Sequence, residues 1–378
     1  MSWSAKRLDQ LGTVSRGRSR HRPRDAAHLY GGRHPFIQTG DVKHAGLYIT
    51  GCTQTYSDAG LEQSKLWPAG TLCITIAANI ADTAILGIDA CFPDSVIGFI
   101  ADPEQADARF VKYLFDATIK VRAQQFSQGA TQDNLSQEKL LSLDFSVPTV
   151  GEQRRIADVI SRYDDLIENN HRRMALLEDS ARLLYREWFV RLQFPGYEHT
   201  PIVDGVPNGW ERLPLEAALV LQRGFDLPTQ DRQEGSVPIY GSTGILGYHD
   251  KAKAIAPGVV TGRSGTLGEV QYVAEDFWPL NTALWVKEFK RVTPLFALFL
   301  LREMDLKQFN GGASVPTLDR KSVHRVDILI PSLSMLRSFD EFAADVYEQI
   351  KCLNTQNQKL RAARDLLLPR LMSGELAV

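Results

Sequence analysis

Two long stretches of this chain have the hydrophobic periodicity of coiled-coil helices. Residues 152–194 and 332–368 contain neither glycine nor proline, and Pro148, Gly151, Pro195, Pro331 and Pro369 flank them. Apolar positions recur at alternating spacings of four and three residues, which is typical of a coiled coil rather than of an ordinary surface helix. About 40 residues in a helix form a rod of roughly 60 Å. The positions are Ile156, Ile160, Tyr163, Ile167, Asn170, Met174, Leu177, Ala181, Leu184 and Trp188, then Phe339, Ala343, Val346, Ile350, Leu353, Asn357, Leu360, Arg364, Leu367 and Leu371.

Each of these two seams contains a single asparagine, Asn170 in the first and Asn357 in the second. Suppose that the helices pack antiparallel with the asparagines facing each other. A residue a given number of positions after Asn170 then faces the residue the same number of positions before Asn357, and this fixes every other layer. Trp188 then faces Phe339, and Tyr163 faces Arg364, where a cation–π contact is expected. Two buried amides that satisfy each other penalise every shifted register, so we expect this pair to fix the alignment.

The second helical pattern repeats the first at a constant offset of 183 residues. Ile156 corresponds to Phe339 and Ile160 to Ala343, and the register continues to Trp188 and Leu371. The segments before the helices match as well, because the polar turn at 129–135 corresponds to the turn at 312–318. A duplication of this size predicts two similar modules, each ending in a long helix.

The regions outside the helices are rich in glycine, proline and short β-branched runs, which indicates strands. We predict a mixed α/β (α+β) fold with an internal pseudo-two-fold repeat, in which two long antiparallel coiled-coil helices separate two globular domains. The predicted parts are a first domain at 1–150, a central helix at 151–195, a second domain at 196–331 and a C-terminal helix at 332–378. Between the two domains the offset drifts, so their loops have diverged while the helices have not. The clearest predicted strands are Pro35–Ile37, Thr71–Ile76, Val96–Ile100, Val259–Val260, Val270–Val273 and Ala283–Val286.

Composition narrows the class of protein. With 378 residues, 44% hydrophobic and 23% charged, the chain is long enough for two domains with separate cores. No apolar run is long enough to span a bilayer, and no signal peptide is expected at the N-terminus. Four cysteines without a CxxC pair argue against a disulfide framework or a zinc site, so a reducing cytoplasm is the expected location. The net charge of −2 gives no indication of a nucleic-acid partner, which must be sought in local basic clusters.

Several short motifs occur in the same order as in a known family. The order of domain, long helix, domain and long helix, together with these motifs, resembles the specificity (S) subunit of type I restriction–modification systems over essentially the whole chain. One difference is that the second helix lacks the Glu-Gln-Arg-Arg-Ile start of the first, so the two helix starts are not equivalent. The motifs are Glu152–Ala157, Asp165–Asn170, Leu336–Phe339, Leu366–Leu376, Phe36–Val42 and Ile239–Gly244.

This resemblance implies two target recognition domains, each reading one half of a bipartite DNA sequence. It implies helices that set the spacer between the half-sites and dock two methyltransferase (M) subunits. It places S-adenosylmethionine on the M subunits and ATP with Mg²⁺ on restriction (R) subunits where these are present, with no cofactor on this chain. Such a chain is not itself an enzyme, although the assembled complex would be an endonuclease and adenine methyltransferase.

Motifs of catalysis are weak or missing. No Asn-Pro dipeptide occurs, so the Asn-Pro-Pro-Tyr/Phe type of methyltransferase motif is absent. Glu288–Lys290 and Asp305–Lys307 fit a nuclease tripeptide, but Pro93-Asp94 lies far from them in the chain. The glycine-rich run Gly262–Gly268 lacks the Lys-Ser/Thr ending of a phosphate-binding loop, so a strand-connecting turn or a DNA-facing loop is expected there.

Basic and polar loops are the candidate DNA contacts. Five arginines alternate within nine residues without an apolar residue among them, so they belong either to a solvated loop or to a DNA-contacting one, where arginine binds phosphate or guanine. We expect them to affect DNA binding and not folding. The glycine-containing turns around 128–132 and 311–314 are either structural or DNA-facing. The candidates are Arg16, Arg18, Arg20, Arg22, Arg24, Lys43, Gln128, Thr131 and Gln132 in the first module, and Lys251, Lys253, Arg263, Ser264 and Ser314 in the second, where Arg223 and Arg232 are secondary.

The main hypothesis is therefore a DNA sequence-recognition scaffold without its own active site, with double-stranded DNA and M subunits as partners. One alternative is a stand-alone nuclease or methyltransferase, which the missing motifs disfavour. The other is a coiled-coil adaptor that binds only proteins, which the basic loops on both domains disfavour. Salt-dependent DNA binding separates the adaptor from the main hypothesis.

Overall fold

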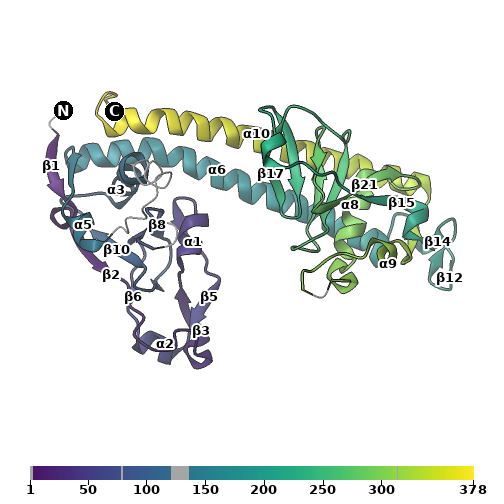
Figure 1. Ribbon diagram of the computed structural model, residues 1–378, viewed down its shortest axis with the longest axis horizontal. Helices are drawn as coiled ribbons and strands as arrows, with labels where there is room; N and C mark the ends of the chain where they lie inside the picture. Colours follow the sequence, from purple (N-terminus) through teal and green to yellow (C-terminus); the bar gives the residue numbers. More distant parts are fainter. Residues whose placement is uncertain (1–2, 78–79, 121–135, 313) are drawn as a thin grey trace. The chain divides into compact units, whose positions relative to one another are not determined.

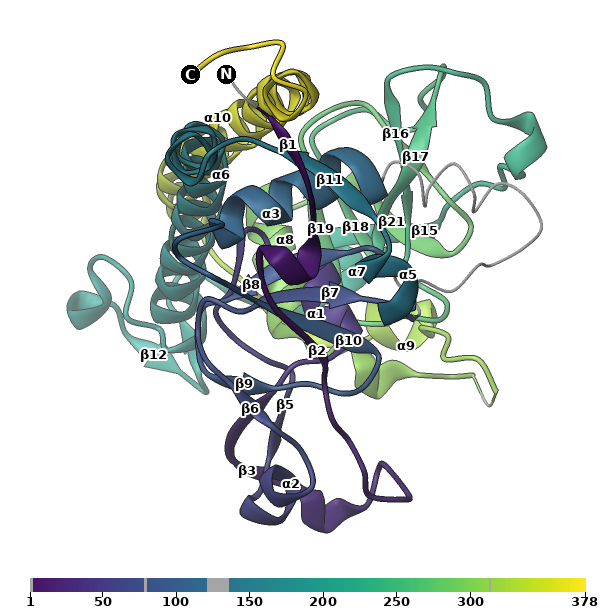
Figure 2. The same ribbon diagram turned by 90° about the vertical axis from the view of Figure 1, so that its left-hand side faces the viewer.

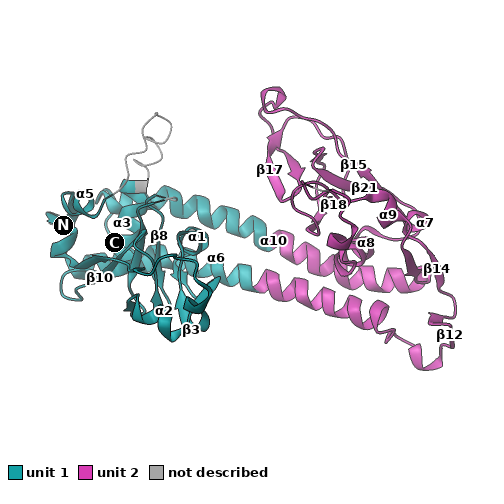
Figure 3. Cartoon of the chain, turned by 60° about the horizontal axis from the view of Figure 1, so that its bottom comes forward, with its two compact units in different colours: residues 1–172, 353–378 teal, residues 173–352 magenta. Residues whose placement is uncertain are grey.

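The computed structural model describes residues 3–77, 80–120, 136–312 and 314–378 (Figure 1). The fold is mixed α/β, as predicted. The chain divides into two compact units, which Figure 3 colours separately: unit 1 comprises residues 1–172 and 353–378, and unit 2 comprises residues 173–352. Each unit contains a globular part and a segment of each of two long helices, α6 (Val150–Tyr185) and α10 (Leu333–Met372).

The two long helices begin at equivalent positions of the repeat. The Thr149 amide and hydroxyl both donate to the Glu152 carboxylate, at 3.3 and 2.9 Å, which caps the start of α6. In α10, Ser332 takes the place of Thr149 and accepts from the Met335 amide at 3.4 Å. A residue with a short hydroxyl side chain thus precedes each helix. In α6 the Glu152 carboxylate accepts from a free amide, and in α10 the Ser332 hydroxyl does so.

The helix ends differ from the prediction. After α6 a single π-helical turn, Arg186–Val190, follows, and the chain leaves the helix at Leu192, whose φ is 59°, before Phe194. The second helix does not stop at Pro369 but continues to Met372. A proline in the last turn removes only one backbone donor. The buried residues Leu371 and Met372, which belong to the core of unit 1, favour the extra turn.

Within each unit the helices pair antiparallel in the register that the two asparagines predict. In unit 1 the Asn170 amide donates to Asn357 Oδ1 at 2.9 Å, and these side chains are only 6% and 1% exposed. In unit 2 the rings of Trp188 and Phe339 lie 6.4 Å apart. Both pairs belong to the predicted set of facing positions.

The layer of Tyr163 and Arg364 was predicted wrongly. Arg364 does not stack on Tyr163 but donates to the Asp164 carboxylate at 2.5 Å. That carboxylate is 8% exposed and also accepts from the Tyr113 hydroxyl at 2.6 Å. A charge-assisted hydrogen bond to a nearly buried carboxylate is stronger than a cation–π contact at a half-exposed ring. Burial, together with the Asp164 charge, raises the pKa of Tyr113 far above its usual range, so its hydroxyl stays protonated as a donor.

Unit 2 contains a network of the same three chemical groups. The Glu178 carboxylate on α6 accepts from Arg302 at 2.6 Å and from the Tyr347 hydroxyl at 3.2 Å. Arg302 lies on the helix of the globular part and Tyr347 on α10. In each unit, therefore, an arginine, a carboxylate and a tyrosine connect the globular part to both long helices.

The globular part of unit 1 consists of two main sheets. The smaller sheet and α2 (Asp58–Glu62) lie at the end of the unit away from α6, as Figures 1 and 2 both show. Helix α3 (Ala108–Phe115) contacts the larger sheet and carries Tyr113, and α1 (Thr39–His44) and α5 (Gln137–Leu141) complete the unit. The larger sheet has the order β2 (Gly12–Arg16), β10 (Val96–Ala101), β7 (Leu72–Thr75), β8 (Thr83–Leu86), β4 (Tyr48–Ile49); the smaller has β5 (Gln54–Tyr56), β3 (Tyr30–Phe36), β9 (Ala90–Cys91), β6 (Leu66–Trp67); and β1 (Ser4–Arg7) pairs with β11 (Asp144–Val147).

The globular part of unit 2 repeats this topology. Its strands β15-β21-β18-β19 follow one another as β2-β10-β7-β8 do in unit 1, and the parallel pair β16·β20 corresponds to β3·β9. Helices α8 (Pro294–Glu303) and α9 (Arg320–His324) correspond to α3 and α5, and α7 (Leu215–Ala218) takes the place of the 3-10 helix Leu8–Gln10 of unit 1. The strands are β12 (Ile202–Val203), β13 (Val206–Pro207), β14 (Glu211–Pro214), β15 (Leu219–Arg223), β16 (Val237–Gly241), β17 (Gly244–His249), β18 (Gly258–Gly262), β19 (Val270–Val273), β20 (Trp278–Pro279), β21 (Ala283–Phe289) and β22 (Asp327–Ile330).

The different starts of the two helices have a structural reason. Gln153, in the Glu-Gln-Arg-Arg-Ile segment, is 1% exposed and donates to the backbone oxygens of Gln105 and Pro148, at 3.1 and 3.0 Å. Its repeat counterpart Leu336 is also 1% exposed but lies in the apolar core of unit 2. The difference therefore lies in how each helix attaches to its own globular part, and polar contacts in one unit are replaced by apolar ones in the other.

We predict that the asparagine pair acts as a unit. Asn170→Leu alone leaves the buried Asn357 amide without its partner and should lower the free energy of unfolding by about 1–3 kcal/mol. Replacing both asparagines with leucine should recover most of that loss, because an apolar layer needs no partner. Denaturant unfolding of the full chain measures both effects. Asn169→Leu, a change at the adjacent exposed asparagine, is the matched control, and equal stability of the N170L and N169L variants would contradict the prediction.

Candidate nucleic-acid interface

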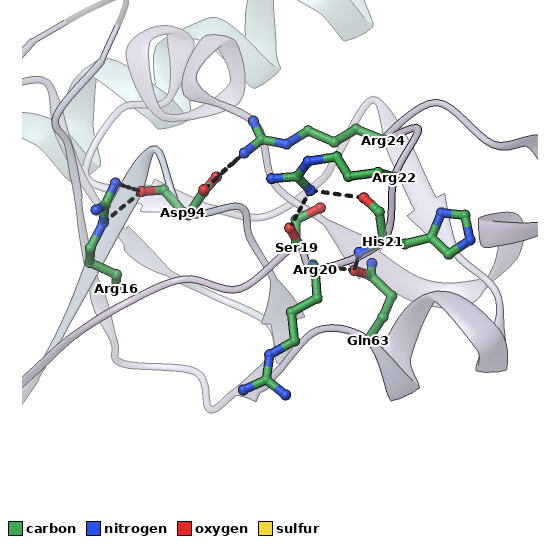
Figure 4. Close-up of polar contacts among 8 residues, drawn as sticks. All are labelled: Arg16, Ser19, Arg20, His21, Arg22, Arg24, Gln63 and Asp94. Atoms are coloured by element: carbon green, nitrogen blue, oxygen red, sulfur yellow. Dashed lines mark hydrogen bonds and ion pairs between the residues drawn. The ribbon is translucent and has the colours of Figure 1, made fainter.

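The arginine-rich segment of unit 1 is a folded loop between β2 and β3. Its backbone is held by hydrogen bonds from the Arg18 amide to the Phe92 oxygen, at 3.0 Å, and from the Arg20 amide to Gln63 Oε1, at 2.6 Å. Figure 4 shows the bond between Arg20 and Gln63. Gly17 is required here, because a Cβ at this position would lie 2.3 Å from the Pro93 oxygen. These hydrogen bonds and the close contact at Gly17 fix the backbone conformation of the loop.

Three of the five arginines stabilise this loop. Arg16 donates to the backbone oxygen of Asp94 at 2.9 and 2.7 Å, and Arg24 Nη2 donates to both oxygens of the Asp94 carboxylate at 2.9 and 2.8 Å (Figure 4). Arg22 donates to the backbone oxygens of Ser19 and His21 at 2.9 and 2.8 Å. For these three arginines, such contacts count against the expectation that the run has no part in folding, which stays a prediction. The guanidinium groups thus hold the loop at residues 16–24 in place, because the loop has few apolar side chains that could pack.

The other two arginines differ from these and from each other. The Arg20 side chain is exposed and points away from the other residues drawn in Figure 4, and no acceptor among the described residues binds its guanidinium. Arg18 is half-buried, and its Nε atom has no partner among the described residues. Of the five, Arg20 is thus the one whose charge is available to a ligand.

The remaining candidates of the first module lie apart from this loop or outside the structure. Lys43 is exposed in the last turn of α1. Gln128, Thr131 and Gln132 lie outside the described residues.

In unit 2 the candidates fall into two groups. Lys251 and Lys253 are exposed in the connection between β17 and β18. The Lys253 ammonium lies 5.3 Å from the ring centroid of Trp278 and 5.9 Å from that of Phe225. Of the secondary candidates, Arg223 is exposed and lies 3.5 Å from Asp226.

The second group consists of Arg263, Ser264 and Ser314, which lie on two polar loops in contact with each other. Ser264 forms a β-bridge with Thr317, and the Leu318 amide donates to the Arg263 oxygen at 2.8 Å, so Arg263 and Ser264 lie beside the turn that contains the exposed Ser314. The Arg263 guanidinium donates to the Asn281 backbone oxygen at 3.2 Å. The glycine-rich run is thus a strand connection fixed by backbone hydrogen bonds. The loops form a shallow pocket lined by Gly265, Thr266, Leu267, Glu269, Lys307, Asn310 and Pro316.

One basic residue was missed in the sequence. Lys65 precedes β6, and its ammonium lies 3.7 Å from the ring centroid of the buried Trp67. The only local signal is the Lys-x-Trp spacing, which places both side chains on the same face of an extended segment. That spacing is too short a motif to indicate a function without the three-dimensional context.

The carboxylates of the weak nuclease motifs have structural contacts. Asp94 binds Arg24, and Asp305 accepts from the Lys307 amide at 3.3 Å at the start of a short 3-10 helix. Within the described part of the chain, no three His, Cys, Asp or Glu side chains are grouped so that they could hold a metal ion. The same part contains no helix that is both long and apolar enough to cross a membrane.

Comparisons with known proteins agree with this architecture. A family model described as "Type I restriction modification DNA specificity domain" matches residues 2–179. The chain is 24% identical to the MjaIX specificity subunit of Methanocaldococcus jannaschii over all of this chain and 94% of that one, and 19% identical to the HindI specificity subunit of Haemophilus influenzae over 66% and 72%.

A crystal structure of the type I restriction–modification S subunit from M. genitalium has a similar fold. Its TM-score is 0.58 at 16% sequence identity, over 98% of this chain and 96% of that one. The family model thus covers the first module and most of the central helix, and one relative matches the chain over its whole length. The chain is therefore similar to type I restriction–modification specificity subunits.

Proposed function

We propose that each unit of this chain reads one half of a split DNA sequence, and that the chain contributes specificity without an active site of its own. The observation that carries this proposal is the duplicated globular part, which is attached through equivalent polar networks to one pair of helices. Two similar readers on one chain suit a target with two half-sites, because each reader contributes its own base contacts. Diverged loops on a common framework suit half-sites of different sequence.

Within this proposal the basic loops hold phosphates and position the domains on DNA. Arg20 in unit 1 and Lys251 in unit 2 are exposed, as phosphate contacts must be. Methyltransferase subunits would supply S-adenosylmethionine and flip the target adenine out of the helix. Restriction subunits, where present, would supply ATP-dependent translocation and cleavage. The chain would then decide which adenine is modified while its partners perform the chemistry.

Exchanging one globular part tests the modular claim. Residues 1–150 are replaced by the corresponding part of another specificity subunit, and the methylated adenines in DNA modified by the assembled complex are sequenced. We expect one half of the methylated sequence to change and the other half, together with the spacer, to stay the same. Retention of both halves, or a change in both, would show that reading is not divided between the units.

We further propose that the long helices dock the methyltransferase subunits through an exposed apolar face. Leu183 and Leu366 occupy equivalent positions of the repeat and are 56% and 73% exposed. Leu176 lies seven residues before Leu183, which puts it on the same face of α6, and it is 69% exposed. Val190, at the end of the π-helical turn that follows α6, is 55% exposed. Exposed leucines at matched positions are typical of a surface that a partner covers.

The docking proposal predicts a change in subunit stoichiometry. Leu183→Lys and Leu366→Lys should each reduce the methyltransferase recovered per specificity subunit from two copies towards one, and the double variant should recover almost none. Native mass spectrometry of the co-expressed complex measures this ratio. Leu246→Lys, the same change at a half-exposed leucine of a globular part, should leave it at two. Two copies in the double variant would place the docking surface elsewhere.

A further inference from the structure

Lys65 in unit 1 rests on a stack of aromatic rings. Its ammonium lies 3.7 Å from the centroid of Trp67, and Trp67 stacks on Phe92 with their centroids 4.7 Å apart. Both rings are fully buried, whereas the lysine is exposed. The rings limit where the ammonium can move but leave its outer side open to solvent. A charge held in this way loses little conformational entropy when it binds an anion.

Lys253 in unit 2 has a similar environment. Its ammonium lies over the rings of Trp278 and Phe225, and Trp278 is 8% exposed. Phe225 follows directly after β15 and Gly224, and a Cβ at Gly224 would lie 2.2 Å from the Leu280 oxygen. Gly17, which follows β2 in unit 1, is under the same constraint.

Strand pairing shows that the two lysines are equivalent in the duplicated fold. Leu66, directly after Lys65, pairs antiparallel with Cys91, and Ala254, directly after Lys253, pairs antiparallel with Phe277. Cys91 precedes Phe92-Pro93 and Phe277 precedes Trp278-Pro279, which correspond in the repeat. The two lysines therefore occupy one structural position. The sequence hides this equivalence because the offset between the domains drifts through this region.

Both lysines keep their charge available. Among the described residues, neither forms an ion pair with a carboxylate or any other polar side-chain contact. Lys65 also lies next to the arginine-rich loop, because the adjacent Ser64 donates to the Arg18 oxygen at 2.7 Å. A single exposed ammonium with three donors and no fixed planar geometry suits one phosphate oxygen better than a base edge.

We propose that Lys65 and Lys253 are a matched pair of phosphate contacts, one in each half of the DNA target. This inference rests on the proposed function and adds to it two specific positions. Because phosphate contacts carry no sequence information, the pair should determine affinity and its salt dependence but not the base sequence that is read. The two contacted phosphates should occupy equivalent places in the two half-sites.

The test uses the assembled complex and a DNA duplex that contains its methylated target sequence. The slope of log affinity against log salt is negative. Lys65→Gln and Lys253→Gln should each reduce its magnitude by about 0.9, and the double variant should reduce it by about twice that amount. In phosphate-ethylation interference, Lys65→Gln should remove the effect of ethylation at one phosphate of one half-site. Lys253→Gln should remove it at the equivalent phosphate of the other half-site. Lys65→Arg, which retains the charge, should keep the slope. Lys287→Gln on β21 is the matched control, because Lys287 is exposed and its ammonium makes no cation–π contact among the described residues.

Three outcomes overturn this inference or its basis. Unchanged slopes in both Gln variants, with a wild-type complex whose binding is salt-dependent, reject the lysine pair and leave the proposed function intact. A changed methylated sequence in either variant rejects the claim that these residues contact only phosphate. A wild-type complex that does not bind the duplex in a salt-dependent way rejects the proposed function itself.

Discussion

The antiparallel pairing of α6 and α10 is the constraint on which both units depend. Neither helix can shift by one turn without separating Asn170 from Asn357, and each buried amide would then lose its partner. The apolar layers alone would tolerate a shifted register, because leucine, isoleucine and alanine pack with one another in many combinations. A weakly stabilising polar pair thus excludes the alternatives that the strongly stabilising apolar layers leave open.

The networks of arginine, carboxylate and tyrosine transmit this register to the globular parts. In unit 1 the tyrosine comes from the globular helix and the arginine from α10, whereas in unit 2 the arginine comes from the globular helix and the tyrosine from α10. The carboxylate comes from α6 in both units. The two units therefore share the same three chemical groups between the globular part and the long helices, although the arginine and the tyrosine have exchanged positions. The Asp164 carboxylate, which is 8% exposed and has two donors, resists sliding most strongly, because any displacement leaves a nearly buried charge without hydrogen bonds. Glu178 is 41% exposed, so the same displacement costs less in unit 2.

Sequence patterns predicted the parts of the structure that depend on periodic apolar residues. The long helices, their facing positions and strands such as β7, β10 and β21 all follow from local spacing. The patterns failed where a residue's partner lies far along the chain and where no shared periodicity connects the two positions, as one does for Asn170 and Asn357. The partner of Arg364 depends on Tyr113 and Asp164, and the continuation of α10 through Pro369 depends on the core that Leu371 and Met372 enter. The candidate site was harder to predict for the same reason, because Asp94 lies 70 residues from Arg24 and no local rule connects them.

The most direct measurement is the sequence context of methylated bases in DNA modified by the complete complex containing this chain. The account predicts one split motif, with two specific parts separated by a spacer of fixed length and unspecified sequence, and one methylated adenine in each part. A single uninterrupted motif, or a spacer that varies between modified sites, would contradict the proposal of two readers held by one helix pair in a fixed register.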